Sequence, residues 1–218
     1  MKFFIFLVLF TSLSSLAFEK GRGSEFNLTS NGQKAKLSIY VAESKFSQVD
    51  IEMFMSAGAG IFSTNMWQQF SIGIKDTNSA VNIKNALIKV SGENSIMVMP
   101  DEFFTKSDHV DLRDFLVSNP KNLEKYKVGE EVIEVPAGKV KSTHYKKVSN
   151  DHQVDYWLSN QAGDIKLVKM ISKGKKTSQN YIIELVSLLK NVKKHIDPNK
   201  SITKEKSLQK LKSLGLVK

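Results

Sequence analysis

The 218-residue sequence contains no cysteine. It can therefore form no disulfide, offer no thiolate to a metal ion, and carry no lipid anchor of the usual cysteine-linked kind. Small secreted scaffolds commonly depend on disulfides, so an exported chain without cysteine suits a bacterial periplasm better. The absence of cysteine thus excludes one class of metal site and favours one compartment.

Recognisable catalytic motifs are also lacking. Residues 56–60 form a small-residue loop without the lysine and hydroxyl residue of a phosphate-binding loop, and no serine occupies a G-x-S-x-G elbow. No two of the four histidines have the spacing of zinc ligands on a helix or hairpin. We therefore predict a protein that is not an enzyme and that uses neither a metal nor a cofactor.

Dense groups of titratable residues are few. The two candidates for acid–base or metal chemistry are Asp101-Glu102 and Asp108-His109-Asp111. Such a role requires the side chains to converge in a cleft, whereas acids at a helix start and a solvated histidine explain them more simply. His144 shares a predicted strand face with Val140 and Val148, so we expect its ring to be hydrogen-bonded within the core.

Long hydrophobic runs are absent except at the beginning of the chain. Residues 3–16 are all apolar or hydroxyl-bearing, and Ser15 and Ala17 place small residues where signal peptidase cleaves. The run is shorter than the roughly 20 residues of a typical transmembrane helix. We expect residues 1–17 to be a signal peptide cleaved before Phe18, with an uncleaved membrane anchor as the alternative, and we expect the mature protein in the periplasm.

The remaining sequence is dominated by short alternating segments. Apolar and polar side chains alternate in runs separated by turn signals such as Pro136-Ala137-Gly138, as is typical of an antiparallel meander. Clear examples of the apolar positions are Leu37, Ile39, Val41, Val49 and Ile51. We predict a mainly β (α+β) domain over residues 34–190, preceded by a linker at residues 18–33.

Part of this region resembles a known family. The segments EEVIEVPAGKVKSTHY (130–145), VDYWLSNQAGDIKLVKM (154–170) and IIELVSL (182–188) are similar to uncharacterised bacterial periplasmic domains. Those domains are in turn similar to the lipoprotein-localisation carriers LolA and LolB. The resemblance implies a strongly curved antiparallel sheet, an unclosed β-barrel, whose apolar concave face is plugged by helices. In the carriers this cavity holds acyl chains.

Methionine is concentrated in the predicted strands. Methionine adapts well to apolar ligands, although plain core packing explains any single one of these residues. The segment after Pro100 contains two adjacent phenylalanines and a predicted helix at residues 108–118. We predict that an acyl chain is bound by Met53, Met55, Met97, Met99, Phe103, Phe104, Leu112, Phe115 and Leu116.

Positive charge exceeds negative charge, and the excess is uneven. The chain has 32 basic and 22 acidic residues, a net charge of +10, and nine lysines with two acids lie in residues 190–218. We expect residues 191–218 to form a basic, partly helical tail on which Leu208, Leu211 and Leu214 share a face. Its contacts with an anionic membrane or a partner are predicted for Lys206, Lys210 and Lys212. A solvated helix that keeps the protein soluble is the alternative.

Two classes of function agree with these features. The first is a periplasmic binding protein or chaperone for lipid, lipoprotein acyl chains or another apolar ligand. The second is an envelope protein-interaction module that uses the half-barrel as a scaffold and docks a partner through the basic tail or loops. We expect no nucleic-acid partner, because charge is nearly balanced outside the tail. An open apolar cavity of several hundred Å3 favours the first class.

Overall fold

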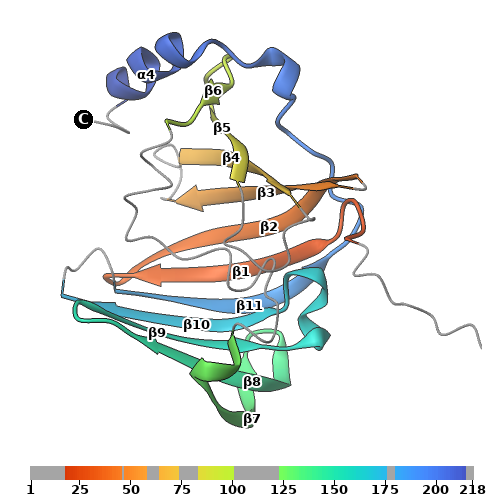
Figure 1. The fold of residues 1–218 in the computed structure, drawn as a ribbon, viewed down its shortest axis with the longest axis vertical. Helices are drawn as coiled ribbons and strands as arrows, with labels where there is room; N and C mark the ends of the chain where they lie inside the picture. The colour runs from red at the N-terminus through yellow and green to blue at the C-terminus, as the bar shows by residue number, and fades with distance from the viewer. Residues whose placement is uncertain are drawn as a thin grey trace, which may run out of the picture.

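In the computed structural model, the residues described are 18–45, 47–57, 64–73, 83–100, 123–175 and 180–214. Within them, eleven strands form one antiparallel sheet in the order β6-β5-β4-β3-β2-β1-β11-β10-β9-β8-β7 (Figure 1). The strands are β1 (Gly23–Ser30), β2 (Gln33–Lys45), β3 (Gln48–Ala57), β4 (Thr64–Gly73), β5 (Ile83–Val90), β6 (Met97–Val98), β7 (Lys127–Val135), β8 (Gly138–Val148), β9 (His152–Leu158), β10 (Leu167–Gly174) and β11 (Tyr181–Leu189). The helices are the 3-10 turns η2 (Glu124–Tyr126), η3 (Asn160–Ile165) and η5 (Pro198–Lys200), and α4 (Lys204–Ser213).

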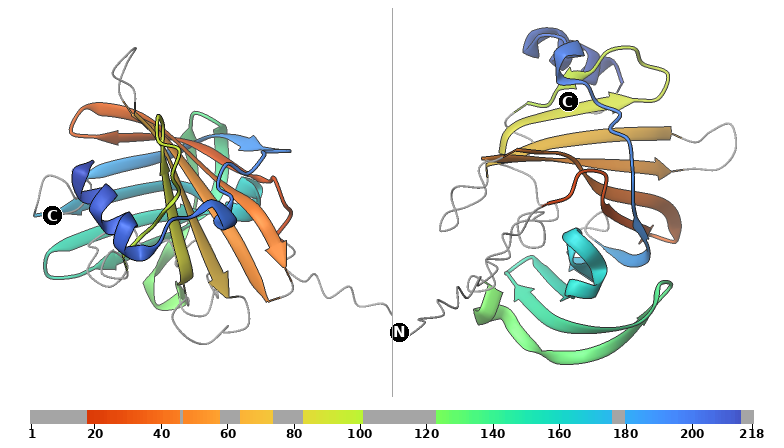
Figure 2. Two further views of the ribbon diagram at one scale, coloured as in Figure 1. Left: turned by 90° about the horizontal axis from the view of Figure 1, so that it is seen from above. Right: turned by 90° about the vertical axis from the view of Figure 1, so that its right-hand side faces the viewer.

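The expected fold class is confirmed. The sheet is open, with β6 and β7 at its two ends, and it twists and curves strongly (Figure 2). The meander arises because each strand pairs with its sequence neighbour, apart from the central pair of β1 and β11. The two halves of the chain therefore join where its first and last strands meet.

Strand β1 lies within residues 18–33, where a linker was expected. It pairs with β2 on one side and β11 on the other, so it is a central strand. Gly23 is required for close packing, since a Cβ atom there would overlap the Ile39 carbonyl and Tyr40. A glycine at such a contact is indistinguishable in sequence from a linker glycine.

One face of the sheet, here called the inner face, carries the main apolar core. Alternate residues of β1 to β5 point into it, as their sequence pattern predicts, and β9 to β11 complete it. Fully buried members include Phe26, Val41, Ile51 and Leu167. Burying one such side chain contributes about 1.5–3 kcal/mol, so this core is the main source of stability.

The opposite, outer face of the β1–β5 half is covered by residues 191–203, here called the C-terminal strap. The strap leaves β11 at the centre of the sheet and runs to the β6 edge (Figures 1 and 2). Its Val192 N–H donates to the Gly21 carbonyl (3.0 Å), and its Ile196 side chain is fully buried with Leu87 and Ile96. A second, smaller core therefore lies on the outer face.

Helix α4 follows the strap and packs against β6, so residues 191–214 are not a detached tail. Thr203 caps the helix, as a hydroxyl residue at this position should, by accepting from Lys206 N–H (3.4 Å). The Val98 N–H donates to the buried Ser207 hydroxyl oxygen (2.9 Å). Leu211 is 2% exposed and belongs to the main core.

Strand β8 departs from the predicted alternation. Val140 and Tyr145, which have opposite parity, both reach the main core, whereas Val148 is exposed. Strand β8 extends beyond the end of β9, and the hairpin it forms with β7 curls back until Ala137 N–H donates to the Leu185 carbonyl (3.0 Å). This curvature lets residues of both parities contact the core.

The prediction that the His144 ring is hydrogen-bonded within the core is wrong. The ring lies part-buried against Trp157. The two rings stack with their centroids 4.4 Å apart, and His144 Nε2 is 2.9 Å from the Asp155 carboxylate. The Trp157 indole N–H donates to the Glu131 carboxylate (2.7 Å). The prediction for His144 failed because strict alternation along the whole of β8 would give the strand a single solvated face, and β8 does not keep that alternation.

Candidate functional site

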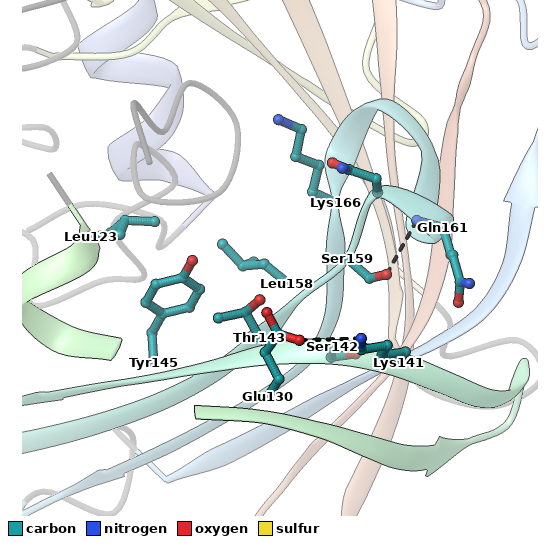
Figure 3. Close-up of a pocket in the computed structure, with 11 residues that line it drawn as sticks. Leu123, Glu130, Lys141, Ser142, Thr143, Tyr145, Leu158, Ser159, Gln161 and Lys166 are labelled. Atoms are coloured by element: carbon teal, nitrogen blue, oxygen red, sulfur yellow. Dashed lines mark hydrogen bonds and ion pairs between the residues drawn. The ribbon is translucent and has the colours of Figure 1, made fainter. Parts of the chain in front are cut away.

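A pocket with a volume of about 420 Å3 lies at the β7–β9 end of the sheet (Figure 3). This size is within the range of small-molecule sites, roughly 300–1,000 Å3. Its floor comes from β8 and β9, and its opposite wall from the chain around η3. The lining residues are Leu123, Glu130, Lys141, Ser142, Thr143, Tyr145, Leu158, Ser159, Asn160, Gln161 and Lys166.

The η3 wall is held rigidly. Ala162 and Ile165 are fully buried, and the Ser24 hydroxyl of β1 donates to the Ala162 carbonyl (3.1 Å). The Ser159 side chain accepts from Gln161 N–H (3.2 Å), which begins the turn. These contacts fix the wall to the central strand, so the pocket is preformed on this side.

Lys166 ends the η3 turn in the left-handed conformation, with φ of 57°. Its amide donates to the Gly163 carbonyl (3.2 Å), and its carbonyl accepts from Ser159 N–H (2.8 Å). A lysine rarely adopts this conformation, but here both backbone groups are satisfied. The Lys166 side chain lines the pocket from the side opposite Thr143 and Tyr145 (Figure 3).

The pocket is amphipathic. Leu123, Tyr145 and Leu158 supply the apolar surface, and all three belong to the main core. Hydroxyl, amide and charged groups supply the rest, and the exposed Lys141 ammonium lies 3.3 Å from the Glu130 carboxylate. An exposed ion pair of this kind is weak, so either charge can turn to a ligand at little cost.

The predicted methionine site does not coincide with this pocket. Met97 is fully buried and Met99 nearly so, and both belong to the main core. Met53 and Met55 are half-buried on the inner face of β3, and Met53 packs against that core. For Met97 and Met99 the structure supports core packing, the alternative that the sequence left open. Ligand binding by these residues remains a prediction.

Several predicted site residues lie outside the described residues. These are Phe103, Phe104, Leu112, Phe115 and Leu116, together with the acidic groups around Asp101 and His109. The predicted signal peptide at residues 1–17 also lies outside them. Among the residues that are described, no group of three or more His, Asp or Glu side chains could hold a metal ion.

The most buried polar cluster joins the strap to the outer face. The fully buried Glu52 carboxylate accepts from the amides of His195 (3.0 Å) and Ile196 (3.1 Å), and from the Tyr40 hydroxyl. Burial, then the bond to Glu52, raises the pKa of the Tyr40 hydroxyl well above its usual range. His195 Nδ1 lies 3.2 Å from the same carboxylate.

This cluster is an anchor. The Glu52 side chain has no exposed surface, and its carboxylate satisfies the buried Ile196 amide, which would otherwise be unpaired. His195 is the exposed member, and its ring stacks on Trp67 with centroids 5.3 Å apart. The anchor is not predictable from the sequence, because a glutamate on the polar side of an alternating strand normally indicates a solvated face.

The lysines predicted to contact a membrane or partner lie on α4. Lys206 and Lys212 are exposed, and the Lys210 ammonium forms an ion pair with Glu93 (2.8 Å). The leucine face of this helix is divided, since Leu211 is buried and Leu208 is 39% exposed. In the described part of the chain, no helix has both the length and the hydrophobicity to span a bilayer.

No protein-family model and no curated protein matches the chain. Among solved structures, it resembles MucB, with 12% identity, a TM-score of 0.39, and coverage of 86% of this chain and 59% of MucB. MucB has also been crystallised in complex with MucA(peri). The chain thus spans about three fifths of the MucB length.

Two further structures cover more of their own length. A hypothetical protein of Chlamydia trachomatis has 12% identity and a TM-score of 0.44, with 84% of this chain and 95% of that one covered. A protein of Bacteroides fragilis with a YmcC-like fold, described as exported, has 15% identity and a TM-score of 0.35, with 79% and 99% covered. These likenesses are too loose to assign the chain to a family or to a function.

Proposed function

We propose that this protein is a non-catalytic binding protein of the bacterial periplasm that holds an amphipathic ligand in the pocket at the β7–β9 end of the sheet. The ligand class that fits best is an acyl chain with a polar head, as in a lipid or the lipid part of a lipoprotein. The observation that carries the proposal is the pocket of about 420 Å3, whose lining combines apolar side chains with hydroxyl, amide and charged groups.

The lining supports a ligand with two different ends. Leu123, Tyr145 and Leu158 offer an apolar surface, and each Å2 that a ligand covers contributes about 25 cal/mol. Lys141 and Lys166 also line the pocket, where an anionic head group would gain an ion pair. Both properties together favour an anionic amphiphile over a wholly apolar molecule.

The proposal can be tested by titrating the purified protein with a fluorescent fatty acid. We expect saturable binding that Thr143→Trp weakens at least tenfold, because the indole would fill the pocket. Thr29→Trp makes the same change on β1, away from the pocket lining, and should leave the affinity within about twofold, roughly 0.4 kcal/mol.

Met55→Glu distinguishes the two candidate sites. If this variant loses binding while Thr143→Trp retains it, the ligand lies on the methionine strands that the sequence predicted, and the pocket is not the site. If the wild-type protein binds no fatty acid, the carrier function is wrong. The interaction module predicted from the basic tail would then be the better account.

A further inference from the structure

The edge strand β7 differs from the rest of the sheet in its exposure. It pairs only with β8 among the described strands, and it stands at the end of the sheet order. Val128 and Val132 are 60% and 64% exposed, although both are β-branched residues suited to a paired strand. Such an edge presents backbone donors and acceptors to any strand that can approach.

Most of β7 is regular enough to accept another strand. The one irregularity in its pairing with β8 lies between Lys127 and Gly129, and from Gly129 to Val135 the register is continuous. At the far end the strand approaches β11, where Ala137 N–H bonds Leu185. Residues 129–134 therefore form a regular stretch that pairs with β8 on one edge and with no described strand on the other.

The charges of β7 are opposite to those of the protein as a whole. Glu130, Glu131 and Glu134 outnumber Lys127 in the strand, although the chain carries a net charge of +10. Glu130, Val132 and Glu134 alternate and thus share one face, so an apolar side chain stands between two exposed carboxylates. On β8, Lys139 lies opposite Glu134 and the Lys141 ammonium lies 3.3 Å from the Glu130 carboxylate, so a strand added on the other edge would share these carboxylates with β8.

The Cβ atoms of directly opposite residues on neighbouring strands lie about 4.5–5.5 Å apart. Opposite charges at such a pair of positions stabilise the strand pairing, whereas like charges destabilise it. Two copies of β7 placed edge to edge would bring glutamates together. A strand with lysine or arginine on either side of an apolar residue would instead pair with Glu130, Val132 and Glu134. Charge complementarity therefore selects a basic segment and opposes a second copy of this edge.

We propose that β7 is a docking edge that binds an extended, basic segment of a partner protein by strand addition. The segment extends the sheet beyond β7, its backbone bonds to residues 129–134, and its basic side chains face Glu130 and Glu134. Glu130 also lines the pocket, whereas Glu134 does not, so a change at Glu134 tests the docking edge separately from the pocket ligand.

The test uses the full chain and a synthetic peptide with blocked ends, Thr-Lys-Val-Lys-Val-Lys-Thr, labelled for fluorescence anisotropy. The net positive charge of the protein opposes non-specific binding of a cationic peptide, so binding requires a local acidic site. We expect saturable binding that weakens with salt. We also expect slower hydrogen exchange at the amides of residues 129–134 when the peptide is bound.

Charge reversals provide the matched control. Glu134→Lys should weaken peptide binding by about tenfold, since it replaces an attractive cross-strand pair by a repulsive one. Glu205→Lys makes the same change in net charge on the exposed first turn of α4, at the opposite end of the sheet, and should change the affinity less than about twofold.

Four results would overturn the proposal. The first three are that the peptide does not bind, that it binds without slowing hydrogen exchange in β7, and that both charge reversals weaken binding equally. The fourth is a dimer of the wild-type protein, measured by light scattering, whose dissociation on dilution speeds hydrogen exchange in β7. That result would show that a second copy of this chain, and not a basic partner segment, occupies the edge.

Discussion

The two edges of the sheet are treated in opposite ways. At the β6 edge, Ile96 forms a parallel bridge with Ser201, and α4 covers the strand with Leu211 in the main core. At the β7 edge, no described element covers the strand, and valines are exposed. An uncovered edge invites pairing with other chains. The chain itself closes the β6 end of the sheet, whereas the β7 end carries the docking edge that we propose.

The covered edge depends on chain that was expected to be a tail. The strap and α4 are rich in lysine and contain few apolar residues, so their composition predicts a solvated tail. The structure buries Ile196, Ser207 and Leu211 and leaves most of the lysines exposed. The segment therefore contributes to the fold through three buried residues, whatever its exposed lysines contact.

The largest expected effect tests whether the strap is fixed by Glu52. Glu52→Ala should lower the free energy of unfolding by about 3–5 kcal/mol, because two backbone amides and the Tyr40 hydroxyl lose their buried acceptor. Urea unfolding followed by circular dichroism measures this loss. Glu43→Ala, on the neighbouring strand β2, removes a surface ion pair with Lys20 and should cost under about 1 kcal/mol. Equal losses in both variants would mean that the strap is not anchored at Glu52.

The next prediction concerns the helix at the covered edge. Leu211→Ala should lower the free energy of unfolding by about 2–4 kcal/mol, since the buried side chain leaves a cavity in the main core. Leu208→Ala changes the same residue type one turn earlier, where the side chain is 39% exposed, and should cost under about 1 kcal/mol. If the two variants unfold at the same urea concentration, α4 is a tail after all, and the contrast between the edges disappears.

Sequence patterns predicted the fold class well because alternation reports which face of a strand is buried. Phe70 and Ile72 in β4, and Tyr156 and Leu158 in β9, are buried as their alternation indicates. The pattern failed where burial has another cause. Gly23 permits close packing in β1, and Glu52 is buried because strap amides, more than 140 residues further along the chain, bond to it. Such long-range partners leave no local signal.

The candidate site was less predictable than the fold. Tyr145 and Leu158 lie in the segments that resemble uncharacterised periplasmic domains, yet nothing in their spacing shows that a pocket opens beside them. The pocket depends on the curl of the β7–β8 hairpin and on the position of the η3 turn, which Ser24 in β1 helps to fix. Both are consequences of tertiary packing. The methionines, in contrast, were conspicuous in sequence, and two of them are core residues.

Alkaline pH should weaken the attachment of the strap by a smaller amount. The pKa of Tyr40 is raised in the folded protein by burial and by Glu52, so the unfolded chain loses this proton first as the pH rises above about 10. Stability from this group is complete below that pH and declines above it, by about 1.4 kcal/mol between pH 9 and 11. Unfolding of wild type and Tyr40→Phe across this range measures the difference.

Wild type must be measured beside Tyr40→Phe because another tyrosine also titrates at high pH. Burial raises the pKa of Tyr181 in β11, so both proteins should lose some stability at high pH. The loss should be smaller in Tyr40→Phe, because only the Tyr40 contribution is removed. Parallel pH profiles would show that Tyr40 ionises in the folded state as readily as in the unfolded one, and would argue against a tightly closed anchor.

The smallest expected effect concerns the ion pair that joins α4 to the turn after β5. Lys210 and Glu93 lie 2.8 Å apart, with side chains 38% and 23% exposed, so solvent and salt screen their attraction. Lys210→Ala should lower the free energy of unfolding by about 0.5 kcal/mol, and a double-mutant cycle with Glu93→Ala isolates the pair. We expect the coupling to vanish in 1 M salt. A coupling above about 2 kcal/mol would mean that this ion pair holds α4 at the covered edge. The burial of Leu211 and the hydrogen bonds of Ser207 and Glu52 indicate instead that buried contacts hold the strap and α4 in place.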